Sequence, residues 1–192
     1  MILSNIEIVK GLDAGYFRID NIAGTDPSLS PFNTSAVDLR LGPEILVPEV
    51  NPVQIDLRQP GIATYWAKNS TAKQISPDQG YSLDKGKLVL ARTIERVAFP
   101  LFGDGQQCYS ARVEGRSSLA RCGVLIHFTA PTIHAGFEGT ITLEIINMGE
   151  TKFLLFPGMF ICQLIIEEVK GCPIGAPNQF KGQDNPAGVV RK

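Results

Sequence analysis

The sequence predicts a mainly β protein, either a jelly roll or a related closed barrel. Beyond residue 15 the helical period of 3.6 residues is absent, and short β-branched or alternating apolar runs recur between clusters of Gly, Pro, Asn and Asp. Many short strands separated by turn residues are typical of such folds. The 192 residues suffice for one domain with a substantial core, so we expect a single domain over residues 1–192.

A short helix is expected at the start of the chain, followed by strands. Ser4 and Glu7 have the spacing of a capping box, in which both side chains bond backbone N–H groups at a helix start. Gly11 and Gly15 limit this helix to two or three turns. The candidate strands are residues 16–19, 36–41, 44–47, 87–91, 108–113, 124–130, 140–147, 152–156 and 159–168.

Two segments depart from the strand pattern. Residues 58–80 are more polar and include the single Trp66, so we expect a long loop or an excursion from the barrel there. Residues 171–192 contain four Gly, three Pro and few large apolar side chains. This flexible tail is either disordered, as termini commonly are, or a lid that a ligand orders, and composition favours the disordered tail.

Charge and cysteine content argue against several classes of function. Lys and Arg total 18 against 19 for Asp and Glu, so we expect no general attraction to nucleic acid or to an anionic membrane. The four cysteines lack a Cys-x-x-Cys spacing and only two histidines are present, which disfavours a zinc site of the usual kind. No run approaches the roughly 20 apolar residues of a membrane span. We expect a cytoplasmic protein with reduced thiols and no zinc.

The strongest candidate site is residues 116–121, Arg-Ser-Ser-Leu-Ala-Arg. Ser117 suits a helix N-cap, and Gly123 suits the end of one or two helical turns. The free N–H groups of such a start, with the forks of Arg116 and Arg121, suit a phosphate group. A solvated turn whose arginines pair with nearby glutamates accounts for the same residues.

A lone carboxylate lies in the alternating segment 140–147. The odd-numbered positions from 141 to 145 are apolar, and Glu144 shares the opposite face with Thr142 and Ile146. Desolvation would raise the pKa of a carboxyl group in such surroundings, as a general base requires. The alternative is an exposed glutamate on the wet face of a strand.

The loop 131–139 lies between these two segments, and its glycines suit a tight turn or close approach to a ligand. Phe137 could face a sugar or a base, or fill the core as aromatic residues commonly do. His134 and Glu138 are four residues apart, but Gly136 between them argues against a helix and so against a metal-binding pair.

Several ordered motifs resemble the dCTP deaminases, a family of the superfamily that includes trimeric dUTPase. The resemblance covers most of the chain outside roughly residues 50–80. The motifs are Val-Glu-Gly-Arg-Ser-Ser-Leu-Ala-Arg at 113–121, His-Phe-Thr-Ala at 127–130, Gly-Phe-Glu-Gly-Thr-Ile-Thr-Leu-Glu at 136–144, Pro-Gly-Met at 157–159 with Ile-Cys-Gln-Leu at 161–164, Ser-Ala-Val-Asp-Leu-Arg-Leu-Gly at 35–42 and Gln-Phe-Lys-Gly-Gln at 179–183.

The resemblance implies a homotrimer of distorted, dUTPase-like jelly-roll barrels with active sites at subunit interfaces. It implies deamination of dCTP to dUTP and ammonia without zinc, which supplies dUTP for thymidylate synthesis, with Mg²⁺ accompanying the triphosphate. Glu144 would take a proton from the water that attacks C4 of cytosine and later deliver protons to the departing amine. Ser117 and the Ala130 carbonyl would hold this water, and Arg121 would stabilise the developing charge. Whether dTTP is a feedback inhibitor stays open.

The resemblance also implies the residues that bind the nucleotide. Thr142 and Leu143 would contact the base through the backbone, and Phe137 would pack on the deoxyribose. Gln179 and Gln183 would close over the phosphates. The full implied set is Arg116, Ser117, Ser118, Leu119, Ala120, Arg121, His134, Phe137, Thr142, Leu143, Glu144, Gln163, Gln179 and Gln183.

One position departs from the family pattern. His134 stands where the family and the dUTPases usually have Asp, which serves the sugar and, in dUTPases, the hydrolytic water. This departure argues against a dUTP diphosphatase or a bifunctional enzyme of the same fold, the first alternatives. A noncatalytic nucleotide-binding trimer is the other, and Glu144 argues against it.

Overall fold

The computed structural model describes residues 1–49, 54–58, 61–103, 105–177 and 180–187. The helices there are α1 (Asn5–Asp13), α2 (Ile62–Lys68) and α3 (Ser117–Arg121). The strands are β1 (Arg18–Asp20), β2 (Phe32–Asn33), β3 (Ala36–Pro48), β4 (Ser70–Gln74), β5 (Tyr81–Leu83), β6 (Leu88–Ala98), β7 (Cys108–Gly115), β8 (Val124–Leu125), β9 (Thr132–Ile133), β10 (Glu138–Asn147), β11 (Phe153–Leu155) and β12 (Phe160–Val169).

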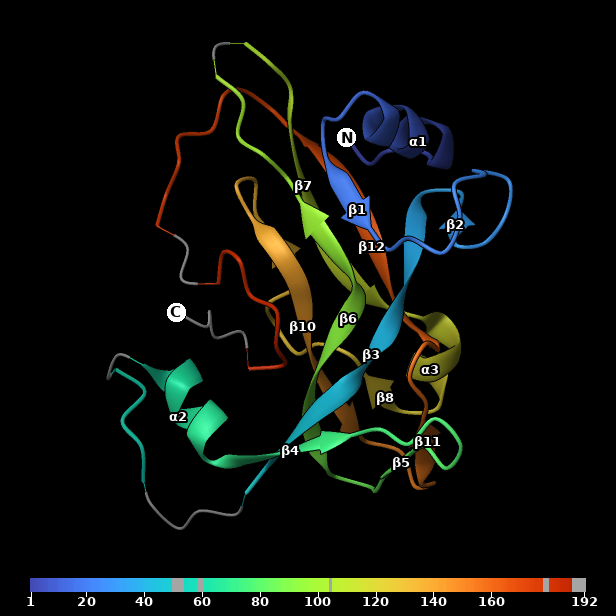
Figure 1. The fold of residues 1–192 in the computed structure, drawn as a ribbon, viewed down its shortest axis with the longest axis vertical. Coiled ribbons are helices and arrows are strands. Elements are labelled where there is room, and N and C mark those ends of the chain that lie inside the picture. The colour runs from blue at the N-terminus through green and yellow to red at the C-terminus, as the bar shows by residue number, and fades with distance from the viewer. Residues whose placement is uncertain (50–53, 59–60, 104, 178–179, 188–192) are drawn as a thin grey trace.

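A strongly curled antiparallel sheet forms the body of the protein (Figure 1). Its strand order is β8-β10-β6-β3-β12-β7-β9, with β1 paired to β6 and both β2 and β4 paired to β3. A separate two-stranded sheet joins β5 and β11. Consecutive strands along this path come from distant parts of the sequence, as in a jelly roll. The predicted mainly β fold is confirmed.

The short N-terminal helix is also confirmed, with half of its predicted cap. Ser4 Oγ accepts a hydrogen bond from the backbone N–H of Glu7 at 3.3 Å. The Glu7 carboxylate instead accepts a bond from Lys10 Nζ at 2.7 Å. Gly11 is required where the helix meets the core, because a Cβ atom there would lie 2.5 Å from the Phe17 ring.

The core is built mainly from buried side chains of the strands, and β10 contributes to it as its alternation predicts. Ile141, Leu143 and Ile145 are at most 3% exposed, whereas Thr142 and Glu144 on the other face are half-buried. A strand turns successive side chains to opposite faces, so this burial fixes the direction of Glu144.

Several predicted boundaries were wrong. The predicted strand 124–130 contains only β8, because the chain after Leu125 leaves the sheet and turns its Phe128 N–H to the Glu144 carboxylate. The segments 36–41 and 44–47 form one strand, β3, with a register shift against β6 between Leu41 and Ile45.

For the described part of residues 58–80, the structure agrees with the expected excursion from the barrel and not with a long loop. Their described part contains α2, which lies away from the sheet in Figure 1, and β4, which pairs with residues 44–48 of β3. β4 is mostly exposed and polar, so the sequence carried no apolar alternation that could have revealed it.

The tail returns to the sheet within its described part. The N–H of Gly182 donates to the Glu138 carbonyl, and the N–H of Thr140 donates to the Gln183 carbonyl at 3.0 Å. Gln183 Nε2 donates to the Thr140 carbonyl at 2.7 Å, and Gln183 is 5% exposed. The favoured disordered tail does not describe this segment, which lies against β10.

Candidate active site

The segment 116–121 forms the predicted helical turn, shifted by one residue. Arg116, with extended φ and ψ of −74° and 132°, is the N-cap of α3, and Ser117 is the first helical residue. The predicted Ser117 cap was therefore wrong, and among the described residues no side chain caps α3. Ser117, Ser118 and Arg121 are exposed, whereas Leu119 packs against the core. The side chains available to a ligand are the two hydroxyls and the arginine.

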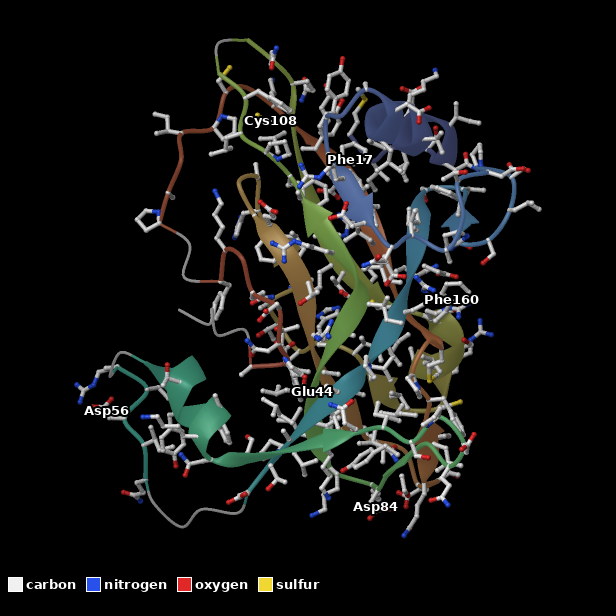
Figure 2. All side chains as sticks on the ribbon, in the orientation of Figure 1. Phe17, Glu44, Asp56, Asp84, Cys108 and Phe160 are labelled. Atoms are coloured by element: carbon white, nitrogen blue, oxygen red, sulfur yellow. The ribbon has the colours of Figure 1, made fainter. Side chains whose placement is uncertain are left out.

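Arg116 is held in place by three groups. Its Nη2 lies 3.3 Å from Asp38 Oδ2, its Nη1 donates to the Phe160 carbonyl at 3.3 Å, and its guanidinium lies 5.7 Å from the centre of the Phe160 ring. Phe160 lies beside α3 in Figure 2. This arrangement orients the guanidinium before any ligand binds, as anion recognition by a fork requires.

Asp38 connects Arg116 to a second predicted residue. Gln163 Nε2 and Asn33 Nδ2 both donate to Asp38 Oδ1, at 3.0 and 3.1 Å. The structure therefore brings Arg116 and Gln163 together on one buried carboxylate. Sequence reasoning assigned Asp38 no role, although a carboxylate inside the apolar segment 36–41 was a usable signal.

Glu144 lies in the environment that its position in β10 predicts. Burial raises the pKa of its carboxyl group above the ordinary value. Bonds from the backbone N–H groups of Phe128 and of Glu144 itself, and the charge of His127, oppose this rise in pKa without cancelling it. A carboxylate with these neighbours can take up and return a proton.

Polar atoms without partners gather around Glu144. Within the described ranges, the buried side-chain atoms that lack a hydrogen bond include Thr142 Oγ1, Arg92 Nε and His127 Nδ1. Thr142 shares the Glu144 face of β10, Arg92 stands opposite Thr142 on β6, and His127 lies close enough to act on the Glu144 charge. Buried polar groups are normally paired, so these atoms are available to a water molecule, a ligand or a partner chain.

α3 is connected to the strand that carries Glu144 through β8. α3 lies beside β8, and β8 pairs with Ile146 and Asn147 of β10, but no ion pair between Arg121 and Glu144 occurs in the part of the chain that the structure describes. Ala130, whose carbonyl was predicted to hold the water, is exposed. The hydrogen bonds of the Glu144 carboxylate come instead from the backbone N–H groups of Phe128 and of Glu144 itself.

The three residues singled out in the loop 131–139 have different surroundings. Phe137 is 6% exposed and belongs to the core, in line with the core alternative for this side chain. His134 is exposed, and its carbonyl accepts the Phe137 N–H at 3.1 Å. Glu138 faces two arginines, Arg96 at 3.2 Å and Arg18 at 3.6 Å.

The remaining predicted residues differ in what they offer a nucleotide. The Leu143 side chain is in the core, so only the backbone of Leu143 can contact a nucleotide. Ala120 is exposed on α3. The Gln183 amide group is occupied by Thr140, so it would have to leave this position to reach a phosphate. Gln179 lies outside the described residues.

Two structural findings bear on cofactors and location. The described ranges contain no group of three or more His, Cys, Asp and Glu side chains arranged to hold a metal ion. None of the helices in the same ranges is long and apolar enough to cross a membrane.

Comparisons with known proteins identify the family. The family model described as dCTP deaminase-like matches residues 2–169. A protein named "dCTP deaminase, dUMP-forming" from Sulfurihydrogenibium sp. is 37% identical over 170 residues, which cover 88% of this chain and 85% of the relative. A dCTP deaminase from Haloarcula marismortui is 35% identical over 191 residues, which cover 97% of this chain and 92% of the relative.

A solved structure shows the same fold. The 2'-deoxycytidine 5'-triphosphate deaminase from Agrobacterium tumefaciens matches with a TM-score of 0.63 and 19% identity, over 88% of this chain and 47% of that chain. This chain therefore spans about half the length of the Agrobacterium protein. The matching family model and the two curated relatives show that the chain belongs to the dCTP deaminase family.

Proposed function

We propose that this protein deaminates dCTP to dUTP and ammonia through attack of water on C4 of the cytosine. The observation that carries the proposal is the environment of Glu144, a half-buried carboxylate with a raised pKa, held by the Phe128 N–H and surrounded by unpartnered polar atoms. These are the properties expected of a general base that accepts a proton from a bound water molecule.

The proton balance of the reaction fits one carboxylate. Glu144 takes one proton from water as the water oxygen bonds to C4, and passes this proton to N3 of the ring. It then takes the second proton from the new C4 hydroxyl and delivers it to the amino group, which leaves as ammonia while C4=O forms. Ser117 and the Ala130 carbonyl hold the water, and Arg121 stabilises the charge that develops on the ring. Thr142 and Leu143 position the base.

The Arg116 side of the site suits the phosphates. Its guanidinium is already oriented by Asp38 and Phe160, and Ser118 is exposed beside it on α3. Mg²⁺ would enter with the triphosphate, because an ion held mainly by phosphate oxygens and water needs no protein cage of three or more ligands. The ion would neutralise phosphate charge near the buried Asp38 carboxylate.

We propose that the active enzyme is a homotrimer in which one chain supplies Glu144 and its neighbour supplies Arg121. Support comes from the unpartnered atoms on the Glu144 face, and from the lack of an ion pair between Glu144 and Arg121 among the described residues. Mixing two inactive variants tests this arrangement. Glu144→Gln and Arg121→Gln chains, unfolded and refolded together, should regain activity at about one quarter of the sites if three chains combine at random.

Two results would contradict the shared site. If Glu144 and Arg121 act in one chain, every chain of the mixture carries a defect and activity does not return. A monomer by light scattering at assay concentration would contradict the trimer itself. Each variant refolded alone is the control for residual activity.

A bifunctional enzyme that continues to dUMP is the second candidate. The names of the Sulfurihydrogenibium and Methanosphaera stadtmanae relatives, 37% and 36% identical, include "dUMP-forming". Against it stands His134 in place of the usual Asp. Incubation with dCTP and Mg²⁺, with ammonia and pyrophosphate measured separately, separates the two. Release of ammonia alone supports the deaminase, and release of both ammonia and pyrophosphate supports the bifunctional enzyme. If neither is released, the protein is a noncatalytic binding protein.

The role of Glu144 has its own test. Glu144→Gln keeps the shape of the side chain but cannot accept a proton, so ammonia release should fall by about 10²- to 10⁴-fold while dCTP binding persists. Glu7→Gln, which removes an exposed carboxylate paired with Lys10 on α1, is the matched control and should leave turnover unchanged. Turnover by Glu144→Gln at the wild-type rate would remove Glu144 from this role.

A further inference from the structure

Strand β6 contains a bulge where it pairs with β10. Thr140 of β10 stands opposite Arg96 of β6. The next pair joins Thr142 to Arg92, so β10 advances by two residues while β6 advances by four. The extra residues of β6 lie within 93–95. A bulge changes which residues of two strands stand opposite each other, and bulges are common beside active sites.

The bulge decides which residue stands opposite Glu144. Beyond the bulge, Glu144 pairs with Leu90. If the pairing of Thr140 with Arg96 continued without a bulge, the position opposite Glu144 would be Arg92, because each step of two residues on β10 would match two on β6. A shift of two residues leaves each side chain on its own face of the sheet. The Glu144 carboxylate would then point the same way but stand opposite an arginine.

Such an arginine would form a close pair with the carboxylate. Side chains directly opposite in an antiparallel pair have Cβ atoms about 4.5–5.5 Å apart, and opposite charges there attract. In the structure Arg92 instead stands opposite Thr142, and its Nη1 donates to the carbonyl of Thr93 at 3.3 Å. No ion pair joins Arg92 to Glu144 in the described part of the chain.

Buried side chains hold the bulge in place. Thr93 is fully buried, and its Oγ1 donates to the Glu95 carbonyl at 2.7 Å and accepts the backbone N–H of Ile141 at 3.0 Å. The hydroxyl thus connects the bulge to β10. The Glu95 carboxylate, 1% exposed, accepts the backbone N–H and the Nε of Arg40 on β3, at 2.8 and 2.7 Å. The bulge is therefore bonded to the strands on both sides of β6.

We propose that Thr93 is a positioning residue for Glu144: by holding the bulge in β6, it places Leu90, and not Arg92, opposite the catalytic carboxylate. This inference rests on the proposed function, in which Glu144 is the general base. A general base must take up a proton during the reaction, and a paired arginine would favour the ionised carboxylate and weaken it as a base.

Two substitutions of Thr93 test its hydroxyl. Thr93→Val keeps the shape of the side chain without the hydroxyl, so kcat for dCTP deamination should fall about tenfold. KM should change less, because the phosphates are expected to bind beside Arg116. Thr93→Ser keeps the hydroxyl and should retain most of the wild-type kcat. Ile8→Ala, at a fully buried position of α1, controls for lost stability and should leave kcat unchanged.

Three outcomes of this experiment would overturn the proposal. The first is a wild-type kcat in Thr93→Val, and the second is a loss in Thr93→Ser as large as that in Thr93→Val. The third is an equal loss in Ile8→Ala, which would show that kcat follows stability alone.

A substitution at position 90 tests the effect of an arginine opposite Glu144. Leu90→Arg places a guanidinium there, so kcat should fall about tenfold. Leu90→Met has an uncharged side chain of similar volume and should stay near wild type. Equal losses in the two variants would show that packing rather than charge matters at this position, and an active Leu90→Arg would show that an arginine is tolerated. Either result contradicts the proposal.

Amide hydrogen exchange tests the bulge without using activity. In Thr93→Val the N–H of Ile141 loses its acceptor and should exchange about tenfold faster than in wild type. The N–H of Leu164, a fully buried residue of β12, should change less. Equal changes at both amides refute the role of Thr93 even if Glu144 is the base. If the wild-type protein releases no ammonia, faster exchange at Ile141 alone rejects the proposed function but upholds Thr93 as the residue that holds the bulge.

Discussion

Replacing Asp38 by Asn should loosen the group of residues that orients Arg116. The new asparagine could keep its carbonyl oxygen toward Asn33 and Gln163, where Asp38 Oδ1 accepts both amides. Its amide group would then face Arg116 Nη2, now 3.3 Å from a carboxylate oxygen. Two donors would meet, so Arg116 should lose its ion pair and keep only its contacts with Phe160.

The size of the effect follows from burial. The Asp38 side chain is 8% exposed and that of Arg116 is 34% exposed. A hydrogen bond to a charged group contributes about 1.5–3 kcal/mol when buried, and the partial exposure of Arg116 reduces this value, so we expect a loss of about 1–2 kcal/mol in the free energy of unfolding. Glu150→Gln is the matched control, because Glu150 pairs with Lys85 but is 85% exposed.

Urea unfolding measures the stability of both variants. It is done at one fixed protein concentration, because the stability of an oligomer depends on concentration. The midpoint should fall for Asp38→Asn with an unchanged slope and stay near wild type for Glu150→Gln. The KM for dCTP should rise more than kcat falls, because the change affects binding of the phosphates rather than the chemical step. Equal midpoints for the two variants would refute this account of Asp38.

Three further predictions concern β10. Burial raises the pKa of Glu144, and a general base must be ionised to accept a proton. As the pH falls, kcat/KM should therefore begin to decline at a higher pH than it would with an exposed glutamate as the base. A flat pH profile would contradict this assignment. Gly139→Ala should detach the tail, because the new Cβ would lie 2.9 Å from a tail carbonyl, and trypsin should then cleave after Lys181 faster than in wild type. Ile145→Ala should lower the free energy of unfolding by about 2–5 kcal/mol, and Ile146→Ala by about 1 kcal/mol, because only the Ile145 side chain is fully buried. Thermal or urea unfolding measures both losses, and similar values would show that β10 is misoriented.

Local patterns made much of the fold predictable. The alternation of residues 140–147 predicted which side chains of β10 enter the core, and the spacing of Ser4 and Glu7 predicted α1. β4 could not be predicted in this way, because its side chains are polar and exposed and its place is set by pairing with β3. Such pairing joins residues far apart in the sequence, which single-segment patterns do not record.

The parts of the site that depend on the type and strand position of a single residue could be predicted. The parts that depend on contacts between residues far apart in the sequence could not. The half-buried setting of Glu144 followed from its strand position, and its raised pKa agrees with that expectation. The link between Gln163 and Arg116 depends on Asp38, which lies 125 residues before Gln163 in the sequence. His127 likewise acquires its neighbours only when the chain after β8 leaves the sheet.

The position of the tail also concerns the solubility of the protein. On the side of β10 away from β6, β8 pairs only with Ile146 and Asn147, and the tail bonds the backbone of Glu138 and Thr140. Without the tail, this part of β10 would present unpaired N–H and C=O groups, to which a strand of another molecule can add. A chain that ends before Gly182 should therefore self-associate through this edge, so the same residues that are expected to act on the nucleotide also protect the sheet.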